Sequence, residues 1–109
     1  MFQIGINQRI FMATHSIDFR KGIDAIAAVC WRKFQLDPKS GHCFLFRNRA
    51  KTAIKMLTFS PLGYWLCHMR LSQGTFIHWP KNSSGIYEIK PNELKALLCN
   101  QVYFKPTEN

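Results

Sequence analysis

Short apolar segments separated by turn-forming sequences fill the middle of the chain, and they restrict the fold more than any other feature. Bulky and aromatic residues dominate four such segments, residues 42–47, 52–59, 64–71 and 75–79. The sequences between them are polar or contain glycine or proline, namely residues 48–51, 60–63 and 72–74. Tight turns between sequential strands join antiparallel neighbours. The pattern therefore predicts an antiparallel meander.

Strands are also predicted on either side of this block. Residues 9–14 are rich in bulky apolar side chains, and residues 86–89 form a small edge strand after a loop at 82–85. The first seven residues are predicted to be a loose lead-in. The tail from Val102 is predicted to add a last strand and to fray at residues 106–109.

A first helix is predicted between Asp18 and Phe34. Asp18 is expected to be its N-cap, because a carboxylate accepts hydrogen bonds from the free N–H groups of the first turn. Apolar residues then recur at spacings of three and four, which places them on one helix face. These residues are Ile23, Ile26, Ala27, Cys30 and Phe34.

A shorter second helix is predicted near the C-terminus. Pro91 suits the first helical position, where its missing N–H has no intrahelical partner to lose. Leu94, Leu97 and Leu98 then form an apolar stripe. The sum is an α+β fold in one domain over residues 1–109. An antiparallel meander of about four to six short strands packs against one longer N-terminal helix, with a short C-terminal helix added.

The charge distribution is uneven. The chain has 15 Lys and Arg residues against six Asp and Glu, a net charge of +9, and the stretch 38–87 contains no Asp or Glu. The cations of this stretch are Lys39, Arg47, Arg49, Lys51, Lys55, Arg70 and Lys81. Such a basic field attracts polyanions, of which nucleic acid is the most common, although a merely solubilising surface is the alternative. The lack of carboxylates argues against a Mg²⁺ site in this stretch.

Two cations lie at the predicted start of the first helix. Arg20 and Lys21 are unfavourable there, because a helix N-terminus already carries a partial positive charge. That cost favours a role in phosphate contact. The alternative is an ion pair with Asp18 or Asp24.

The remaining candidate contacts lie in the meander. Arg47, Arg49 and Lys51 cluster in one predicted hairpin turn, which either grips a DNA backbone or groove or is simply a solvated turn. Lys55 and Arg70 lie in predicted strands and are expected to project from a sheet face. Lys55 has an alternative role as a blocker of a strand edge. With the pair at the helix start, these five residues form the predicted DNA-contact set.

Aromatic residues offer a second type of contact. Phe44, Phe46, Tyr64, Trp65 and Trp79 lie in the predicted strands and either form a base-stacking platform or pack into the core. The core is the interpretation favoured for most of them.

Metal, disulfide and membrane chemistry are not predicted. The four cysteines match no zinc spacing, and without a secretion signal they are expected to be free thiols in the cytoplasm. No apolar run approaches the ~20 residues of a transmembrane helix. His42, His68 and His78, with Lys55, supply the residue types of a metal-independent nuclease.

Seven short patches align in order with a known family. They are Asp18-x-Arg20-Lys21-Gly22-x-Asp24, Asp37-Pro38-x-Ser40-Gly41, Phe44-x-Phe46-x-Asn48-Arg49, Ile54-Lys55-x-Leu57, Gly63-x-Trp65-Leu66, Arg70-Leu71 and Gly74-x-Phe76 followed by Trp79-Pro80. Their order and spacing resemble the second-reading-frame (TnpB-type, Orf2-like) accessory protein of bacterial insertion-sequence family 66. The RNA-guided nuclease that shares the TnpB name is a different protein. The resemblance runs from about Arg9 to Lys105.

The resemblance implies a non-enzymatic accessory protein of transposition. A separate, larger transposase of the same element would carry the catalytic carboxylates, and the small protein would need no cofactor. Its expected partners are DNA, including the terminal repeats of the element, and that transposase. Self-association is left open.

Two other functions remain as alternatives. In the first, the protein docks on the transposase without touching DNA. In the second, it is a small nuclease that uses the three histidines, none of which lies in the shared patches.

Overall fold

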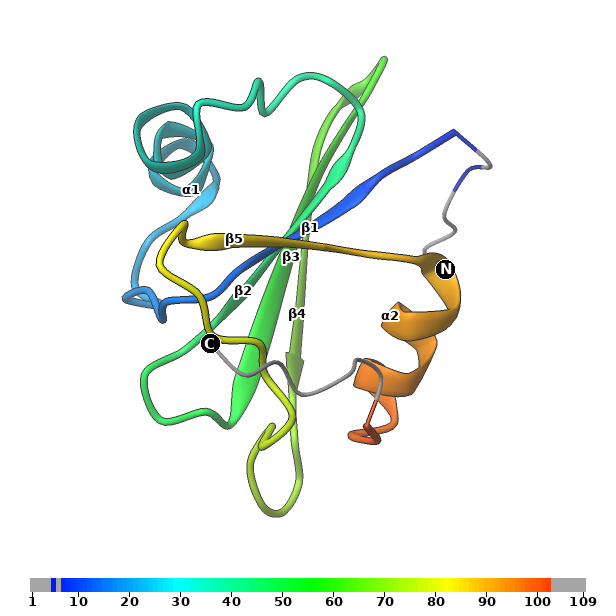
Figure 1. Ribbon diagram of the computed structural model, residues 1–109. Coiled ribbons are helices and arrows are strands. Elements are labelled where there is room, and N and C mark those ends of the chain that lie inside the picture. Colours follow the sequence, from blue (N-terminus) through cyan, green and yellow to red (C-terminus); the bar gives the residue numbers. More distant parts are fainter. Residues whose placement is uncertain (1–4, 6, 103–109) are drawn as a thin grey trace.

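In the computed structural model, which describes residues 5 and 7–102, five strands form one sheet in the order β4-β3-β2-β1-β5 (Figure 1). The strands are β1 (Ile10–Ala13), β2 (Cys43–Arg47), β3 (Ala53–Ser60), β4 (Gly63–Arg70) and β5 (Ile86–Ile89). The helical segments are α1 (Ile23–Val29), its π-helical continuation η1 (Cys30–Phe34), and α2 (Pro91–Leu98). The α+β class is confirmed.

The sheet is mixed, so the prediction of a purely antiparallel sheet is wrong. Strands β2, β3 and β4 do form an antiparallel meander, but β1 pairs in parallel with β2, with Phe11 opposite Phe44. Parallel neighbours need a crossover connection, and here α1 and η1 supply it. Strand β5 closes the other side of β1 in antiparallel register.

The strand predicted at residues 75–79 is also wrong, because this segment forms no strand. Phe76 and Trp79 are both buried in the same apolar cluster. Residues three apart in a strand would point to opposite faces, so burial of both on one face requires an irregular backbone. Two hydrogen bonds hold it: Phe76 donates its N–H to the Lys51 carbonyl at 2.7 Å, and Trp79 Nε1 donates to the Ala13 carbonyl at 2.9 Å.

The first helix begins later than predicted. Gly22 precedes its first residue, and Asp18 is not the N-cap. The Asp18 carboxylate instead accepts hydrogen bonds from the backbone N–H and the guanidinium of Arg20. The α-helical part, α1, has seven residues, whereas α2 has eight. The prediction of one longer N-terminal helix is therefore wrong for α1 alone, and the N-terminal helix is the longer one only when η1 is counted with it.

The second helix begins at Pro91 as predicted. The Glu93 carboxylate accepts a hydrogen bond from the Lys90 N–H at 2.7 Å, which satisfies a free donor at the helix start. Leu94 and Leu97 are buried, whereas Leu98 is exposed. No strand begins at Val102, and the rest of the predicted C-terminal strand, with residues 106–109, lies outside the described residues.

The core has two halves, one on each face of the sheet, and α1 and α2 cover opposite faces (Figure 1). On the α1 side the buried side chains include Phe11, Ile26, Phe44, Phe46 and Leu57. On the α2 side they include Ile10, Met56, Phe76, Trp79 and Leu97.

The predicted aromatic platform is therefore divided between the two faces. Phe44, Phe46 and Trp79 are core residues, as favoured, and Tyr64 is half-buried. Trp65 is 61% exposed, so for this residue the core interpretation is wrong.

Candidate nucleic-acid interface

The loop of residues 48–52, which joins β2 to β3, is held in shape by Asn48. The Asn48 Oδ1 accepts hydrogen bonds from the backbone N–H groups of Thr52 at 2.8 Å and Ala53 at 3.0 Å, and the Lys51 N–H donates to the Asn48 carbonyl at 3.1 Å. Lys51 adopts a left-handed backbone with φ of 65°. Arg49 and Lys51 are exposed on this ordered loop.

Two other segments meet this loop at the same end of the sheet. The Ile17 N–H donates to the Arg47 carbonyl at 3.1 Å, and Ile17 forms an isolated parallel bridge with Asn48. The Thr14 N–H donates to the Gly85 carbonyl at 3.0 Å. The chain leaving β1, the β2–β3 loop and the loop before β5 are thus tied together.

A hollow of about 360 Å³ opens between the three segments, and we call it the basic hollow. It is lined by Thr14, His15, Ser16, Arg47, Arg49, Lys51, Lys81 and Asn82. Four of these residues are cations, and among the described residues that line it none is Asp or Glu. The hollow therefore concentrates positive charge, with no carboxylate among its described lining residues.

Arg47 is fixed before any ligand arrives. Its Nη1 donates to the Phe76 carbonyl at 2.8 Å, and its guanidinium lies 4.7 Å from the centre of the Trp79 ring. Trp79 is itself fixed by its hydrogen bond to Ala13. A half-buried guanidinium held in this way loses little side-chain entropy when it contacts an anion.

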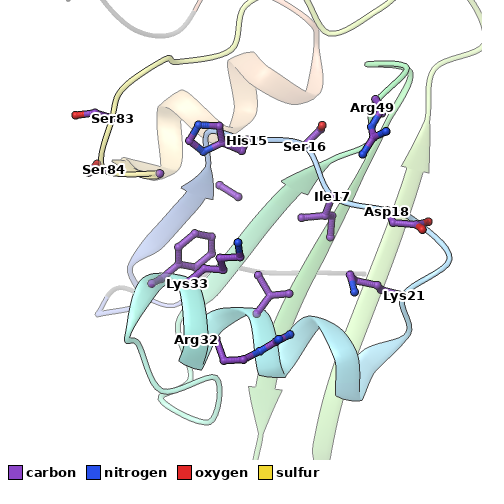
Figure 2. Close-up of a pocket in the computed structure, with 14 residues that line it drawn as sticks. His15, Ser16, Ile17, Asp18, Lys21, Arg32, Lys33, Arg49, Ser83 and Ser84 are labelled. Atoms are coloured by element: carbon purple, nitrogen blue, oxygen red, sulfur yellow. The ribbon is translucent and has the colours of Figure 1, made fainter.

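A larger groove of about 590 Å³ adjoins the basic hollow. Figure 2 shows Lys21, Arg32 and Lys33 on its helical side, with Arg49 across from them and residues 15–18 passing between. Asp18 is the acidic residue in its wall, and Ser83 and Ser84 line its far side. A third hollow, of about 450 Å³, is bounded by residues 17–20 and 48–50. Arg49 lines all three, so they form one continuous basic surface around its side chain.

Comparison with known proteins adds the family. The family model described as IS66 Orf2 like protein (TnpB_IS66) matches residues 8–104. This chain belongs to the IS66 Orf2-like family. Membership confirms the resemblance drawn from the seven sequence patches, and it indicates an accessory role in transposition.

Two curated relatives of this chain come from Sinorhizobium fredii (strain NBRC 101917 / NGR234). The uncharacterized protein y4hO is 32% identical over 108 residues, which is 99% of this chain and 93% of the relative. The uncharacterized protein y4jC is 29% identical over 91 residues, which is 84% of this chain and 77% of the relative. No solved structure matches.

The structure does not present Arg20 and Lys21 as an equivalent pair. The Arg20 guanidinium forms an ion pair with Asp18, with 2.7 Å between Nη2 and Oδ2, which is the alternative considered for it. These hydrogen bonds with Arg20 hold the pKa of the Asp18 carboxyl well below its usual range. Lys21 lines the larger groove. Its predicted phosphate contact is geometrically open, and Arg20 lines the third hollow with its guanidinium already paired to Asp18.

Lys55 has a structural position. Its side chain is 8% exposed, and its Nζ donates to the carbonyls of Phe19 at 2.7 Å and Lys21 at 3.1 Å. It also lies 4.9 Å from the Phe19 ring centre. Strand β3 is internal to the sheet, so the alternative of edge blocking is wrong. Lys55 fastens the loop before α1 to the sheet, and its burial counts against a contact with DNA.

Arg70 lies apart from the three hollows but at the same end of the sheet. It is exposed at the end of edge strand β4, where it pairs with Ala53, and the next residue, Leu71, donates its N–H to the Thr52 carbonyl at 2.9 Å. Arg70 therefore flanks the loop that carries Arg49 and Lys51.

Some lining residues were missed by sequence reasoning. Lys81 belongs to the stretch without carboxylates, and its charge was the available signal, but only the loop before β5 brings it to Arg47. Arg32 and Lys33 carried no signal beyond their position off the apolar helix face. Thr14 and Ser16 carried none.

The histidines of the nuclease hypothesis lie at separate places. His42 Nδ1 accepts a hydrogen bond from the Arg9 N–H at 2.9 Å, whereas the His68 ring packs edge-on against Phe19. Neither they nor His78 line the three hollows. This placement counts against a shared histidine site.

The cysteines are free thiols, as predicted. Cys30, Cys43, Cys67 and Cys99 are all free, and burial raises the pKa of the Cys30 thiol to about 12 and that of Cys43 to about 11. Residues 5 and 7–102 contain no cluster of three side chains able to hold a metal ion. Within the same residues, no helix is long and apolar enough to cross a membrane.

Proposed function

We propose that this protein is a non-catalytic accessory factor of insertion-sequence transposition that binds DNA with the end of the sheet around the basic hollow. One observation supports this above all others. Arg47, Arg49, Lys51 and Lys81 surround one hollow, and no carboxylate lies among the described residues of its wall. Family membership supports the link to transposition.

The contact surface is centred on Arg49. Arg49 lines both the basic hollow and the groove with Lys21, Arg32 and Lys33, so the two together can follow a strand across several phosphates. Arg70 extends this surface along β4. Each phosphate that such cations neutralise releases counterions, so the affinity should fall steeply with salt. The proposed partners are DNA, including the terminal repeats, and the separate transposase, in the cytoplasm of a bacterium.

The test is fluorescence anisotropy of the full chain at several salt concentrations. The probes are a duplex of the element's terminal repeat, a scrambled duplex and a single strand. The variant R49A/K51A should weaken binding to all three and reduce the slope of log K against log salt by about one to two units, since each phosphate contact contributes about 0.9.

The matched control is K39A/K95A. It removes the same charge from two exposed positions outside the three hollows and should leave the slope nearly unchanged. Equal losses in the two double variants would mean that DNA responds to net charge only, and the assigned surface would be wrong.

Docking on the transposase without DNA contact is the second candidate, and exposed apolar side chains favour it. Trp65 is exposed on edge strand β4, Leu62 in the preceding turn and Trp31 on η1. Large exposed aromatic side chains are typical of protein interfaces. Absence of DNA binding by the wild-type chain at low salt would make this the leading function.

A further inference from the structure

Thr14 is a residue of the wall of the basic hollow, and its buried hydroxyl has no partner among the described residues. Thr14 is 8% exposed, and its Oγ1 is buried with no hydrogen-bond partner in the part of the chain that the structure describes. Its backbone is occupied, since the N–H donates to Gly85. A buried hydroxyl without a partner destabilises the fold, so its presence beside four cations calls for an acceptor.

The cations around it come from separate segments that are each held in place. Arg47 is fixed by Phe76 and Trp79. Lys51 lies on the loop held by Asn48. Lys81 precedes a loop in which the Asn82 side chain donates to the Ile86 carbonyl at 2.9 Å and accepts from the Gly85 N–H at 3.1 Å. The hollow is thus built before a ligand enters it.

Charge and size point to one class of ligand. An internal phosphodiester carries one negative charge, whereas a phosphate monoester carries about −1.5 to −2 near pH 7 and presents three acceptor oxygens. Four cations and a free hydroxyl around one hollow match the monoester better. About 360 Å³ lies at the lower end of the roughly 300–1,000 Å³ typical of small-molecule sites, which suits one nucleotide rather than a passing duplex.

We infer that the basic hollow binds the terminal phosphate monoester of a nucleic-acid strand, with the Thr14 hydroxyl as hydrogen-bond donor and Arg47, Lys51 and Lys81 as counter-charges. This inference rests on the proposed DNA-binding function and deepens it. In this arrangement the surface around Arg49 contacts the backbone of the strand, and the basic hollow binds the phosphate at its end.

The test compares short single strands of one sequence that end in a 5′-phosphate, a 3′-phosphate or two hydroxyls. Anisotropy competition with the wild-type chain should show about tenfold tighter binding for one of the phosphorylated strands, the gain expected from charge-assisted hydrogen bonds. Thermal unfolding with thymidine monophosphate or inorganic phosphate as the free ligand forms a parallel assay.

The decisive variant is T14V, which removes the hydroxyl and keeps the branched shape. It should unfold at the same temperature as wild type or higher, because it removes an unsatisfied polar group. It should also lose most of the preference for the phosphorylated end. K81Q should reduce that preference by neutralising one cation, whereas K95Q, on the exposed side of α2, should not.

The possible results separate this inference from the proposed function. Equal binding of all three strands, with a steep salt slope retained, overturns the phosphate-end site and leaves DNA binding standing. Stabilisation by thymidine monophosphate that T14V abolishes, without strand binding, supports a phosphate-monoester site at the hollow but overturns DNA binding and, with it, the strand end as the ligand. A preference that T14V leaves intact overturns the role of Thr14 and with it the inferred site.

Discussion

The two loops that connect the meander strands lie at opposite ends of β3 and are built in different ways. The loop 48–52 carries Arg49 and Lys51 and is tied to segments far away in sequence, through Ile17 and Phe76. The turn 60–63 carries no charge, and the hydrogen bonds of the Ser60 side chain are local: Ser60 Oγ donates to the Gly63 carbonyl at 3.1 Å and accepts from the Leu62 N–H at 3.3 Å.

The turn 60–63 only connects two strands, whereas the loop 48–52 has the support expected of a binding site. A turn that only reverses the chain needs a few local bonds and leaves its side chains in solvent, as for Leu62, which is 99% exposed. The loop 48–52 is instead supported from behind by a buried aromatic segment and from the side by the chain leaving β1. Support of this kind holds Arg47, Arg49 and Lys51 in a defined arrangement, which a solvated turn would not do.

The largest effect should come from removing the support behind the charged loop. Phe76 is fully buried, so Phe76→Ala should leave a cavity behind the loop and destabilise the protein by about 3–5 kcal/mol, while the backbone N–H that donates to the Lys51 carbonyl is kept. Urea unfolding followed by tryptophan fluorescence measures this loss. Leu62→Ala, in the other turn, is the control and should change stability by less than about 0.5 kcal/mol. Similar losses in both variants would mean that the loops do not differ in their tertiary support.

A smaller effect should follow from removing the Asn48 side chain. Asn48→Ala takes away the acceptor for the Thr52 and Ala53 N–H groups, and we expect a loss of about 1–3 kcal/mol with weaker DNA binding. Urea unfolding and anisotropy on the same preparations give both numbers. Ser60→Ala should cost less, because Ser60 Oγ accepts from a single exposed N–H at 3.3 Å whereas Asn48 Oδ1 accepts from two N–H groups, and it should leave DNA binding unchanged. Full DNA affinity in Asn48→Ala would show that the loop need not be ordered to bind.

The same contrast shows what could be predicted from the sequence. Strands β2, β3 and β4 were found because turn residues and apolar alternation are local signals, and the basic loop was found for the same reason. The parallel pairing of β1 with β2 is a non-local choice, made when α1 and η1 cross over the sheet. The segment 75–79 looked like a strand because its two aromatic residues are needed in the core, and the sequence does not say which backbone brings them there.

The candidate site was predictable only in part, for the same physical reason. Arg47, Arg49 and Lys51 are neighbours in sequence, so their cluster was visible. Lys81 and Thr14 join them only through the strand order. Lys55 looked like a surface cation because its burial depends on a loop, residues 19–21, that folds over it from outside the strand.

The smallest effect should come from replacing Lys51, which combines a strained backbone with a positive charge. Lys51 has a φ of 65°, a conformation that glycine adopts without strain and other L-residues adopt at a cost of roughly 1 kcal/mol. Lys51→Gly should therefore raise the free energy of unfolding slightly, by up to about 1 kcal/mol, although glycine also makes the unfolded chain more flexible. The same variant should bind DNA more weakly, because it removes a cation from the basic hollow.

Lys51→Ala separates the two contributions. It keeps the strain and loses the charge, so its DNA affinity should match that of Lys51→Gly while its stability falls below it. Urea unfolding and salt-dependent anisotropy, run on wild type and both variants, provide the comparison. Position 51 favours glycine but holds a lysine. If Lys51→Gly strengthens folding and weakens DNA binding, the lysine is present for its charge. If Lys51→Gly lowered stability and left DNA affinity unchanged, the residue would serve the fold, and the loop 48–52 would differ from the turn 60–63 in its packing but not in its function.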